Sequence, residues 1–296
     1  MKLYLGIDGG GTKTTAAVSD ENGRILLKKT GKTINFFSVG MDRARENLDA
    51  LLCAVCGELG ETQFEAAFIG CSALDGEADN ETVQKLCGSV NAKKIRMHSD
   101  VYIALHSLED GECPCVAICG TGSMATGLDL HGNTVVVGGW GHILGDEGSA
   151  YSIALHAFSR CCELCDEEKE TLLLKKAQSF FGVDSFRQAI DRIYAEDTSK
   201  DVIAAFASTV GEICTQDKDA GSIIVCEAQR FAKTVLTLLG KVEHCTLLGL
   251  YGGVFCNNEL FTQTFTDCIK AIYPQIETRL LKVAPEESAL RLAREL

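Results

Sequence analysis

The sequence contains no apolar run long enough to cross a membrane, and it is poor in positive charge. Its 28 Lys and Arg residues face 41 Asp and Glu residues, which gives a formal net charge of −13 at pH 7. A transmembrane helix needs about 20 consecutive apolar residues, and nucleic acids or anionic lipid surfaces attract basic proteins. Met1-Lys2 leads directly into the first apolar segment, which leaves no room for a secretory signal. We therefore expect a soluble, cytoplasmic protein with no nucleic-acid or membrane partner.

The sequence also lacks two Cys-x-x-Cys elements at the spacing of a structural zinc site. Its 15 cysteines are scattered through apolar segments, where a free thiol behaves as a small hydrophobe in a reducing cytosol. The one cluster is Cys161, Cys162 and Cys165, and it holds a single Cys-x-x-Cys element. The cysteines therefore indicate core packing, with a metal site as the alternative.

Two familiar nucleotide-binding motifs are absent as well. Gly6 and Gly11 have the separation of the first two P-loop glycines, but Thr12 stands where the lysine belongs. Gly9 and Gly11 lack the third glycine of a dinucleotide fingerprint. Neither a Walker site nor a Rossmann site is supported.

The most informative feature that is present lies near the start of the chain. An apolar run, residues 3–7, ends in Asp8, and glycines 9–11 and Thr12 follow. Glycine permits a positive φ and a close backbone approach, so this pattern predicts a tight hairpin whose amides face phosphate oxygens. A carboxylate beside phosphates requires a cation between them, which makes Asp8 a candidate Mg²⁺ ligand, directly or through water. The alternative is a plain hairpin turn with a solvent-facing Asp8.

The same pattern recurs 111 residues further along. The matched positions are Ile7 with Ile118, Gly9 with Gly120, Gly11 with Gly122, and Thr12 with Ser123. Hairpin signals follow both copies, Asn22-Gly23 in the first and Gly132-Asn133 in the second. Each copy predicts three strands joined by two turns, and the pair indicates two related halves. Two phosphate-binding turns that face each other across a cleft would hold a nucleotide from both sides.

Hydrophobic periodicity predicts alternating helices and strands outside the repeats. Apolar residues at steps of three and four predict an amphipathic helix over 41–59. Further strands are expected at 66–71, 94–97, 246–250 and 279–283. Further helices are expected at 83–90, at 259–272 and in segments that begin at 100 and at 286. A mostly helical insertion is expected at about 150–239. The turn residues 111–114 indicate the domain boundary. We therefore expect an N-terminal lobe over 1–112 and a C-terminal lobe over 113–296, with the option that the final helix packs back on the first lobe.

Three segments resemble a known family. They are Asp8–Thr12, Cys119–Ser123 and Gly138–Tyr151, with Gly252-Gly253 as a further match. These segments resemble the N-acetylglucosamine kinases and, more broadly, the BadF/BadG/BcrA/BcrD ATPase family within the sugar kinase, Hsp70 and actin superfamily. The long third segment is the specific one, whereas the first two indicate the fold and ATP use. The resemblance implies a two-lobed α/β fold of the actin-like, ribonuclease H-like ATPase type with a central cleft, and it implies ATP and Mg²⁺.

Asp100 is the candidate catalytic base. It follows a predicted strand at the point where a helix begins, and open α/β sheets present ligand-binding groups at such ends. A carboxylate there can take the proton of a sugar hydroxyl during phosphoryl transfer. The resembling family has its base aspartate at this junction. The alternative is that Asp100 only caps the helix.

The resemblance also implies the substrate contacts. They are Asn35, Ser72, Asp100, Asp146 and the backbone of Gly139, Trp140 and Gly141. Asn35 matches the family's substrate-binding asparagine, with a turn asparagine as the alternative, and Ser72 is a further candidate. The Gly139-Trp140-Gly141 segment would line the acyl group of the sugar. Trp140 is the single tryptophan of the chain, and core packing is its alternative role.

The ATP contacts come from the three glycine turns. They are Gly10, Gly11, Thr12, Thr121, Gly122, Gly252, Gly253 and Asn257. Thr12 and Thr121 can donate hydrogen bonds to phosphate oxygens, and Gly252-Gly253 resembles the adenosine-contacting turn. Asn257 would open the next helix, where a simple N-cap is the alternative. Ser288 stands where the family often has glycine, a departure at the nucleotide edge.

These features predict an ATP-dependent kinase that phosphorylates an amino sugar, with the 6-hydroxyl of N-acetylglucosamine as the first choice. Glucosamine and N-acetylmuramic acid are close substitutes. A competing class is the ATP-driven activator of 2-hydroxyacyl-CoA dehydratases, which carries an iron-sulfur cluster shared between two subunits; the segment 139–149 favours the kinase. A catalytically silent sugar sensor is disfavoured because Asp8 and Asp100 are both present. A homodimer is the oligomeric state considered.

Overall fold

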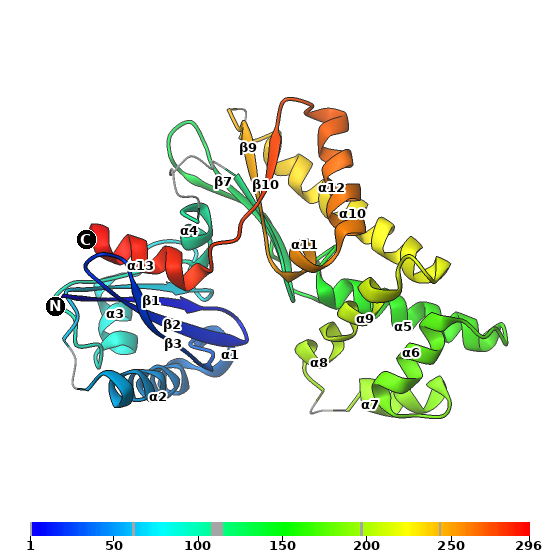
Figure 1. Cartoon of the computed structure of the whole chain (residues 1–296), viewed down its shortest axis with the longest axis horizontal. Coiled ribbons are helices and arrows are strands. Elements are labelled where there is room, and N and C mark those ends of the chain that lie inside the picture. Colours follow the sequence, from blue (N-terminus) through cyan, green and yellow to red (C-terminus); the bar gives the residue numbers. More distant parts are fainter. Residues whose placement is uncertain (1, 61–62, 108–114, 196–197, 243) are drawn as a thin grey trace. The chain divides into compact units, whose positions relative to one another are not determined.

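The chain forms two compact units. The computed structural model describes residues 2–60, 63–107, 115–195, 198–242 and 244–296 (Figure 1). The first unit comprises residues 1–111 and 282–296, and the second comprises 112–281. Residues 282–296, which were expected in the C-terminal lobe 113–296, therefore belong to the first unit. The predicted boundary at 112–113 lies outside the described residues, and the central cleft stays a prediction.

A five-stranded mixed sheet forms the middle of the first unit. Its strands are β1 (Leu3–Gly9), β2 (Lys13–Asp20), β3 (Ile25–Lys32), β4 (Ala66–Cys71) and β5 (Ile95–His98). They lie in the order β3-β2-β1-β4-β5. The hairpins make β1 antiparallel to β2 and β2 antiparallel to β3, whereas β1, β4 and β5 run parallel. The carboxyl ends of β1, β4 and β5 therefore meet at one edge.

The second unit contains a sheet of the same design. Its strands are β6 (Cys115–Cys119), β7 (Ser123–Leu128), β8 (Thr134–Gly138), β9 (Leu247–Tyr251) and β10 (Glu277–Leu280). Their order is β10-β9-β6-β7-β8, again with two antiparallel pairs beside two parallel pairs. The internal repeat predicted from the glycine turns is thus confirmed as a duplicated sheet. The last strand begins two residues before the predicted range 279–283.

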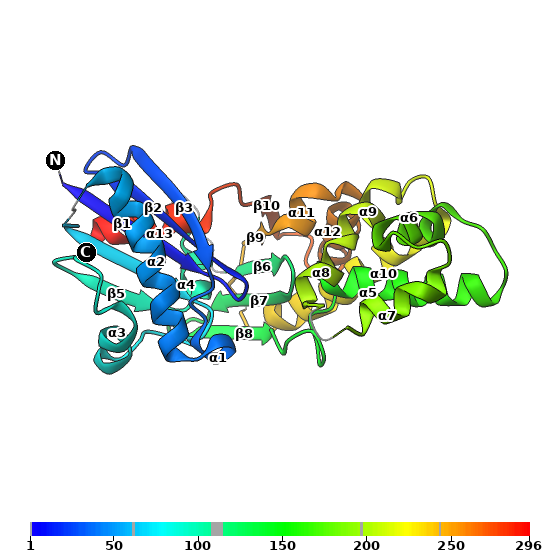
Figure 2. The same ribbon diagram turned by 90° about the horizontal axis from the view of Figure 1, so that it is seen from below.

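Helices cover both faces of the first sheet (Figure 2). They are α1 (Phe36–Val39), α2 (Met41–Leu59), α3 (Asn80–Cys87), α4 (Asp100–Leu105) and α13 (Pro285–Glu295). Alternate residues of a strand face opposite sides, so Ile69 packs in the core beneath α2 while Phe68 packs against α4 and α13. The backbone of α13 comes so close to β1 that a Cβ at Gly6 would overlap Leu290 N. The final helix is therefore an integral layer of the first unit.

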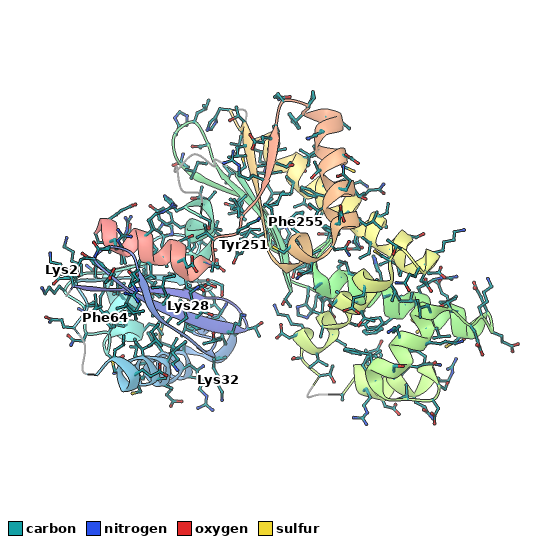
Figure 3. All side chains as sticks on the ribbon, in the orientation of Figure 1. Lys2, Lys28, Lys32, Phe64, Tyr251 and Phe255 are labelled. Atoms are coloured by element: carbon teal, nitrogen blue, oxygen red, sulfur yellow. The ribbon has the colours of Figure 1, made fainter. Side chains whose placement is uncertain are left out.

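The second unit carries most of the helices. They are α5 (Ala150–Asp166), α6 (Leu172–Phe181), α7 (Ala189–Ile193), α8 (Lys200–Ala204), α9 (Phe206–Ile213), α10 (Lys218–Leu239), α11 (Gly253–Asn257) and α12 (Glu259–Ile272), with a short 3₁₀ turn at Phe186–Gln188. Phe255 packs within 5.0–6.0 Å, between ring centroids, of Phe231, Phe261 and Phe265 (Figure 3). These rings join α10, α11 and α12 into one core. The predicted helical insertion is confirmed, as are the bounds 41–59, 66–71 and 259–272.

Within the described residues, no helix combines the length and the apolar character that a membrane crossing requires.

Candidate functional site

The first glycine turn joins β1 to β2, as predicted. Gly9 pairs with Thr14 across the hairpin, and a Cβ at Gly9 would lie 2.5 Å from the Ile34 side chain. Gly10 and Gly11 do not use the positive φ that glycine permits. Gly11 has open space where a side chain would project. Close packing therefore explains why residue 9 is a glycine, and the open space beside Gly11 leaves the turn accessible to a ligand.

Asn35 and Ser72 lie together beside this turn. Asn35 Nδ2 donates to Ser72 Oγ at 2.9 Å, and Ser72 N donates to Gly9 O at 2.8 Å. Asn35 Oδ1 also accepts from the backbone N–H groups of Phe37 and Ser38 and so caps α1. Asn35 therefore does have the local structural role that was considered as the alternative. A substrate contact by Asn35 or Ser72 stays a prediction, and their hydrogen bond places both candidates at the same spot.

Asp8 and Asp100 form an acidic pair at the carboxyl edge of the first sheet. The pKa of Asp100 is raised to about 6, because the effect of burial outweighs that of the backbone hydrogen bonds that its carboxylate accepts at the start of α4. Burial, together with the nearby carboxylates of Asp100 and Glu286, raises the pKa of Asp8 to about 7, although Lys13 acts in the opposite direction. Buried like charges disfavour ionisation in this way. The pair therefore creates a negative site beside the open glycine turn.

Asp100 is not the N-cap residue of its helix. The cap is Ser99, whose Oγ accepts from Tyr102 N at 3.3 Å, while Asp100 is the first helical residue. The carboxylate of Asp100 nevertheless accepts backbone hydrogen bonds at the start of α4. The capping alternative is therefore present in part, and the role of Asp100 as the base stays a prediction.

The acidic pair fits a magnesium ion held jointly with phosphates. Mg²⁺ is commonly bound by one or two carboxylates together with phosphates and water, and a cation would relieve the repulsion that raises the pKa of Asp8. In the part of the chain that the structure describes, no three His, Cys, Asp or Glu side chains come together as metal ligands. The cluster of Cys161, Cys162 and Cys165 thus offers no such group there.

The second glycine turn gathers three predicted ATP contacts. The turn closes through a hydrogen bond from Gly120 N to Gly122 O at 2.9 Å, and Tyr151 N at the start of α5 donates to Thr121 O at 3.4 Å. Gly252 has a φ of 115°, and a Cβ there would overlap Cys119 O at the end of β6. Thr121, Gly122 and Gly252 therefore converge at the end of one strand. Their contact with ATP stays a prediction.

Asn257 is not at the start of a helix. It ends α11, and the cap of α12 is its neighbour Asn258, whose Oδ1 accepts from Phe261 N at 3.0 Å. The expectation that Asn257 opens the helix is therefore wrong. A Cβ at Gly253 would lie 3.7 Å from Asn257 Nδ2, which places this exposed amide beside the predicted adenosine turn.

Residues 139–149, which we call the glycine loop, contain no strand. Gly139, Gly141 and Gly148 have positive φ, and so does Asp146 at 60°. Asp146 is buried, its Oδ1 accepts from Ser123 N at 3.3 Å, and burial raises its pKa. Trp140 is 75% exposed. The core-packing alternative for Trp140 is therefore wrong, and the glycine loop displays its one large ring to solvent.

Two residues that sequence reasoning missed hold the glycine loop in place. Ser123 Oγ donates to Glu147 O at 2.7 Å, and Gly148 N donates to Glu227 Oε2 at 2.7 Å. Glu227 is completely buried on α10. The sequence does mark Glu227, because a charged residue stands there on the apolar face of a helix, three residues after Ile224 and four before Phe231.

The departure at Ser288 has a structural explanation. Ser288 Oγ hydrogen-bonds Ser107 Oγ at 3.2 Å, and both hydroxyls are buried. Two residues earlier, Glu286 forms an ion pair with Lys28 Nζ at 2.9 Å, and Lys28 is labelled in Figure 3. The serine therefore anchors α13 within the first unit.

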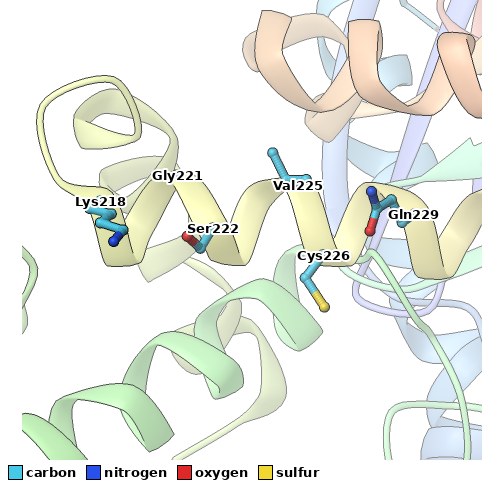
Figure 4. A pocket seen from close by; sticks show the side chains of 6 residues that line it. All are labelled: Lys218, Gly221, Ser222, Val225, Cys226 and Gln229. Atoms are coloured by element: carbon cyan, nitrogen blue, oxygen red, sulfur yellow. The ribbon is translucent and has the colours of Figure 1, made fainter.

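A hollow of about 430 Å³ lies along α10, away from these groups (Figure 4). It is lined by Lys218, Gly221, Ser222, Val225, Cys226 and Gln229. None of the predicted site residues lines this hollow. The candidate site is therefore defined by the hydrogen bonds and short interatomic distances described above, and not by this hollow.

A duplicated sheet with a glycine turn at the end of each first strand defines an actin-like ATPase fold. The BadF/BadG/BcrA/BcrD ATPase family matches residues 5–290, and the chain belongs to that family. It is 28% identical to the N-acetylmuramic acid/N-acetylglucosamine kinase of Clostridium acetobutylicum over 99% of both chains. It is 34% identical to the N-acetyl-D-glucosamine kinase of Dictyostelium discoideum over 51% of each chain. The crystal structure of a candidate N-acetylglucosamine kinase from Porphyromonas gingivalis shares the fold, with a TM-score of 0.79 at 19% identity, over 100% of this chain and 99% of that one.

Proposed function

We propose that this chain is an ATP-dependent amino-sugar kinase that transfers the γ-phosphoryl group of ATP to the 6-hydroxyl of N-acetylglucosamine. The carrying observation is Asp100, a carboxylate with a raised pKa at the edge of a sheet in an ATPase-family fold. N-acetylglucosamine is common to the names of both relatives above, which ranks it before glucosamine and N-acetylmuramic acid.

Asp100 acts as the general base. With a pKa of about 6, its carboxylate is mostly ionised at pH 7 and is more basic than an ordinary aspartate. A general base works best when its pKa lies near the working pH. It accepts the proton of the sugar hydroxyl as the oxygen attacks phosphorus, and the phosphoryl bond to ADP breaks. Neighbouring Asn35 and Ser72 orient the sugar in the first unit.

Asp146 and the glycine loop are the proposed sugar contacts of the second unit. The Asp146 carboxylate accepts hydrogen bonds from sugar hydroxyls, and the backbone of the glycine loop lines the acyl group. The Asp146 side chain is buried and accepts a hydrogen bond from Ser123 N, so it is held in place before the substrate arrives. This reduces the entropy lost on binding.

ATP is held by the glycine turns. Gly10, Gly11, Thr12, Thr121 and Gly122 contact phosphates, and Gly252, Gly253 and Asn257 contact the adenosine. Asp8 would hold Mg²⁺, directly or through water, and the ion would neutralise phosphate charge. The raised pKa of Asp8 supports this assignment, because a bound cation would relieve the repulsion from Asp100 and Glu286 that contributes to it.

The test is an ADP-release assay with MgATP against amino sugars, neutral hexoses and muramic acids, followed by NMR assignment of the phosphorylated carbon. N-acetylglucosamine should give the highest kcat/KM, with the product phosphorylated at carbon 6. Purified Asp100→Asn protein serves as the control for contaminating kinases. Turnover of no sugar, together with visible absorbance from an iron-sulfur cluster after anaerobic purification, would favour the dehydratase activator instead.

A further inference from the structure

We propose that Glu227 is a positioning residue that fixes Asp146 through the backbone of the glycine loop. This inference rests on the proposed function, because it assigns Glu227 to the sugar site of that kinase. Glu227 lies on α10, 81 residues after Asp146 along the chain. Its side chain is completely buried, an unusual environment for a carboxylate.

The carboxylate of Glu227 accepts from three donors. Oε2 accepts from Gly148 N at 2.7 Å, and Oε1 lies 2.7 Å from Arg230 Nη1 and 2.7 Å from His156 Nδ1. One oxygen therefore serves the glycine loop, and the other serves α5 and α10. Arg230 also approaches the loop directly, since its Nη2 lies 3.8 Å from Glu147 Oε1.

The backbone at Gly148 is shaped to reach this carboxylate. A Cβ at Gly148 would lie 2.5 Å from Phe231 Cβ and 3.0 Å from Glu227 O, and its φ is 79°. Only glycine allows the loop to lie this close to α10 in this conformation. The hydrogen bond from Gly148 N thus belongs to a tight contact between the loop and the helix.

Asp146 lies between two such anchors. On one side, Ser123 N donates to Asp146 Oδ1 at 3.3 Å, and on the other side Glu227 holds Gly148 two residues later. Asp146 itself has a φ of 60°, which a residue with a side chain adopts only when its surroundings hold it there. Without one of these two hydrogen bonds, Asp146 should leave that conformation, and its carboxylate should no longer point toward the bound sugar.

Asp217, the N-cap residue of the same helix, provides a matched control. It is also buried, and its carboxylate accepts from two backbone N–H groups, those of Leu173 at 2.9 Å and Ala220 at 3.0 Å. These contacts tie α6 to the start of α10 and do not involve the glycine loop. Loss of either carboxylate leaves buried donors unsatisfied, so both changes should lower stability.

The experiment compares Glu227→Gln with Asp217→Asn by steady-state kinetics and thermal unfolding. A glutamine keeps one acceptor oxygen, so it cannot accept from Gly148 N on one side and from Arg230 and His156 on the other, and the contact between the loop and α10 is weakened. We expect Glu227→Gln to raise the KM for N-acetylglucosamine by about tenfold while the KM for ATP stays within about twofold. Asp217→Asn should lower the unfolding midpoint and leave both KM values within about twofold. Equal behaviour of the two variants would overturn the inference.

Arg230→Gln keeps the proposal testable if Glu227→Gln does not fold. The Arg230 side chain is about one-third exposed, so its loss is better tolerated. It should raise the KM for the sugar by about threefold and leave the KM for ATP unchanged; no selective change in the sugar KM would contradict the inference.

Asp146→Asn separates this inference from the proposed function. If Asp146→Asn leaves the sugar KM unchanged, the proposed sugar site is wrong. If Asp146→Asn raises the sugar KM and the Glu227 and Arg230 variants do not, only the positioning role is overturned.

Discussion

Gly122 and Asp146 lie so close together that a side chain at residue 122 would displace the Asp146 carboxylate. A Cβ there would be 2.8 Å from Asp146 Oδ2 and 3.2 Å from Asp146 Cγ. Gly122 belongs to the predicted phosphate turn, and Asp146 belongs to the predicted sugar loop. The two candidate subsites of the second unit are therefore in direct contact.

This contact predicts a selective effect of Gly122→Ala. The added methyl group should displace the Asp146 carboxylate and raise the KM for N-acetylglucosamine by about fivefold or more. Gly120→Ala is the matched control, since a Cβ at Gly120 meets nothing within 4 Å. Its sugar KM should stay within about twofold of the unmodified protein. Steady-state kinetics with varied sugar and saturating ATP decides the question, and equal sugar KM values for the two variants would contradict it.

The second prediction concerns the base. Asp100→Asn should reduce kcat by at least about 10²-fold, because the amide cannot accept the hydroxyl proton, while ATP binding by calorimetry stays nearly intact. Asp79→Ala is the control, because Asp79 Oδ1 caps α3 by accepting from Thr82 N at 2.7 Å. That variant should lose about 1 kcal/mol of stability and keep its kcat. Near-normal turnover of Asp100→Asn would remove Asp100 from the mechanism.

The third prediction is the pH profile. Asp100 must be ionised to accept a proton, and its pKa is raised to about 6. The value of kcat/KM should therefore fall about tenfold per pH unit below pH 6 and stay level just above it. Assays at saturating Mg²⁺ isolate this limb from the titration of Asp8. An acidic limb near pH 4, the ordinary range of aspartate, would show that the base is a different or a better-solvated group.

The fourth prediction follows from the buried charge of Asp8. Its pKa in the folded chain is about 7, against 3.8 for an ordinary aspartate, so between these values the folded state binds more protons than the unfolded state. Stability must then fall as the pH rises through this window. Without Mg²⁺ and nucleotide, Asp8→Asn should raise the free energy of unfolding at pH 8 by about 1 kcal/mol or more, and by little at pH 3.

Urea unfolding at the two pH values measures this difference for Asp8→Asn. The same variant should raise the KM for MgATP far more than it weakens sugar binding measured without nucleotide. A stabilised variant with an unchanged KM for MgATP would show that Asp8 is merely a buried charge and not a metal ligand.

Local signals in the sequence predicted the strands of both sheets and the helices α2 and α12, but not the separate helices of the insertion or the order of the strands. The glycine turns and their repeat predicted both hairpins, and the apolar steps of 41–59 gave the bounds of α2. Asn257 and Asn258 could not be told apart, because both residues can cap a helix and only the structure shows which side chain reaches Phe261 N.

Contacts between distant segments explain the rest. Glu227 accepts from a residue 79 positions away, and Gly6 is needed because α13 returns to β1 from the far end of the chain. Such features depend on which segments meet in space, and a single sequence carries no record of that.

The last prediction uses Trp140 as a reporter of sugar binding. It is the single tryptophan of the chain, so the tryptophan emission comes from one side chain, and that side chain is 75% exposed on the glycine loop. If the loop backbone lines the acyl group, bound N-acetylglucosamine should shield the indole, shift its emission to shorter wavelength and reduce its quenching by acrylamide. Glucose, which lacks the acyl group, should have a smaller effect at equal occupancy. An unchanged emission with a sugar that is demonstrably turned over would mean that the glycine loop lies away from the acyl group and that another segment recognises it.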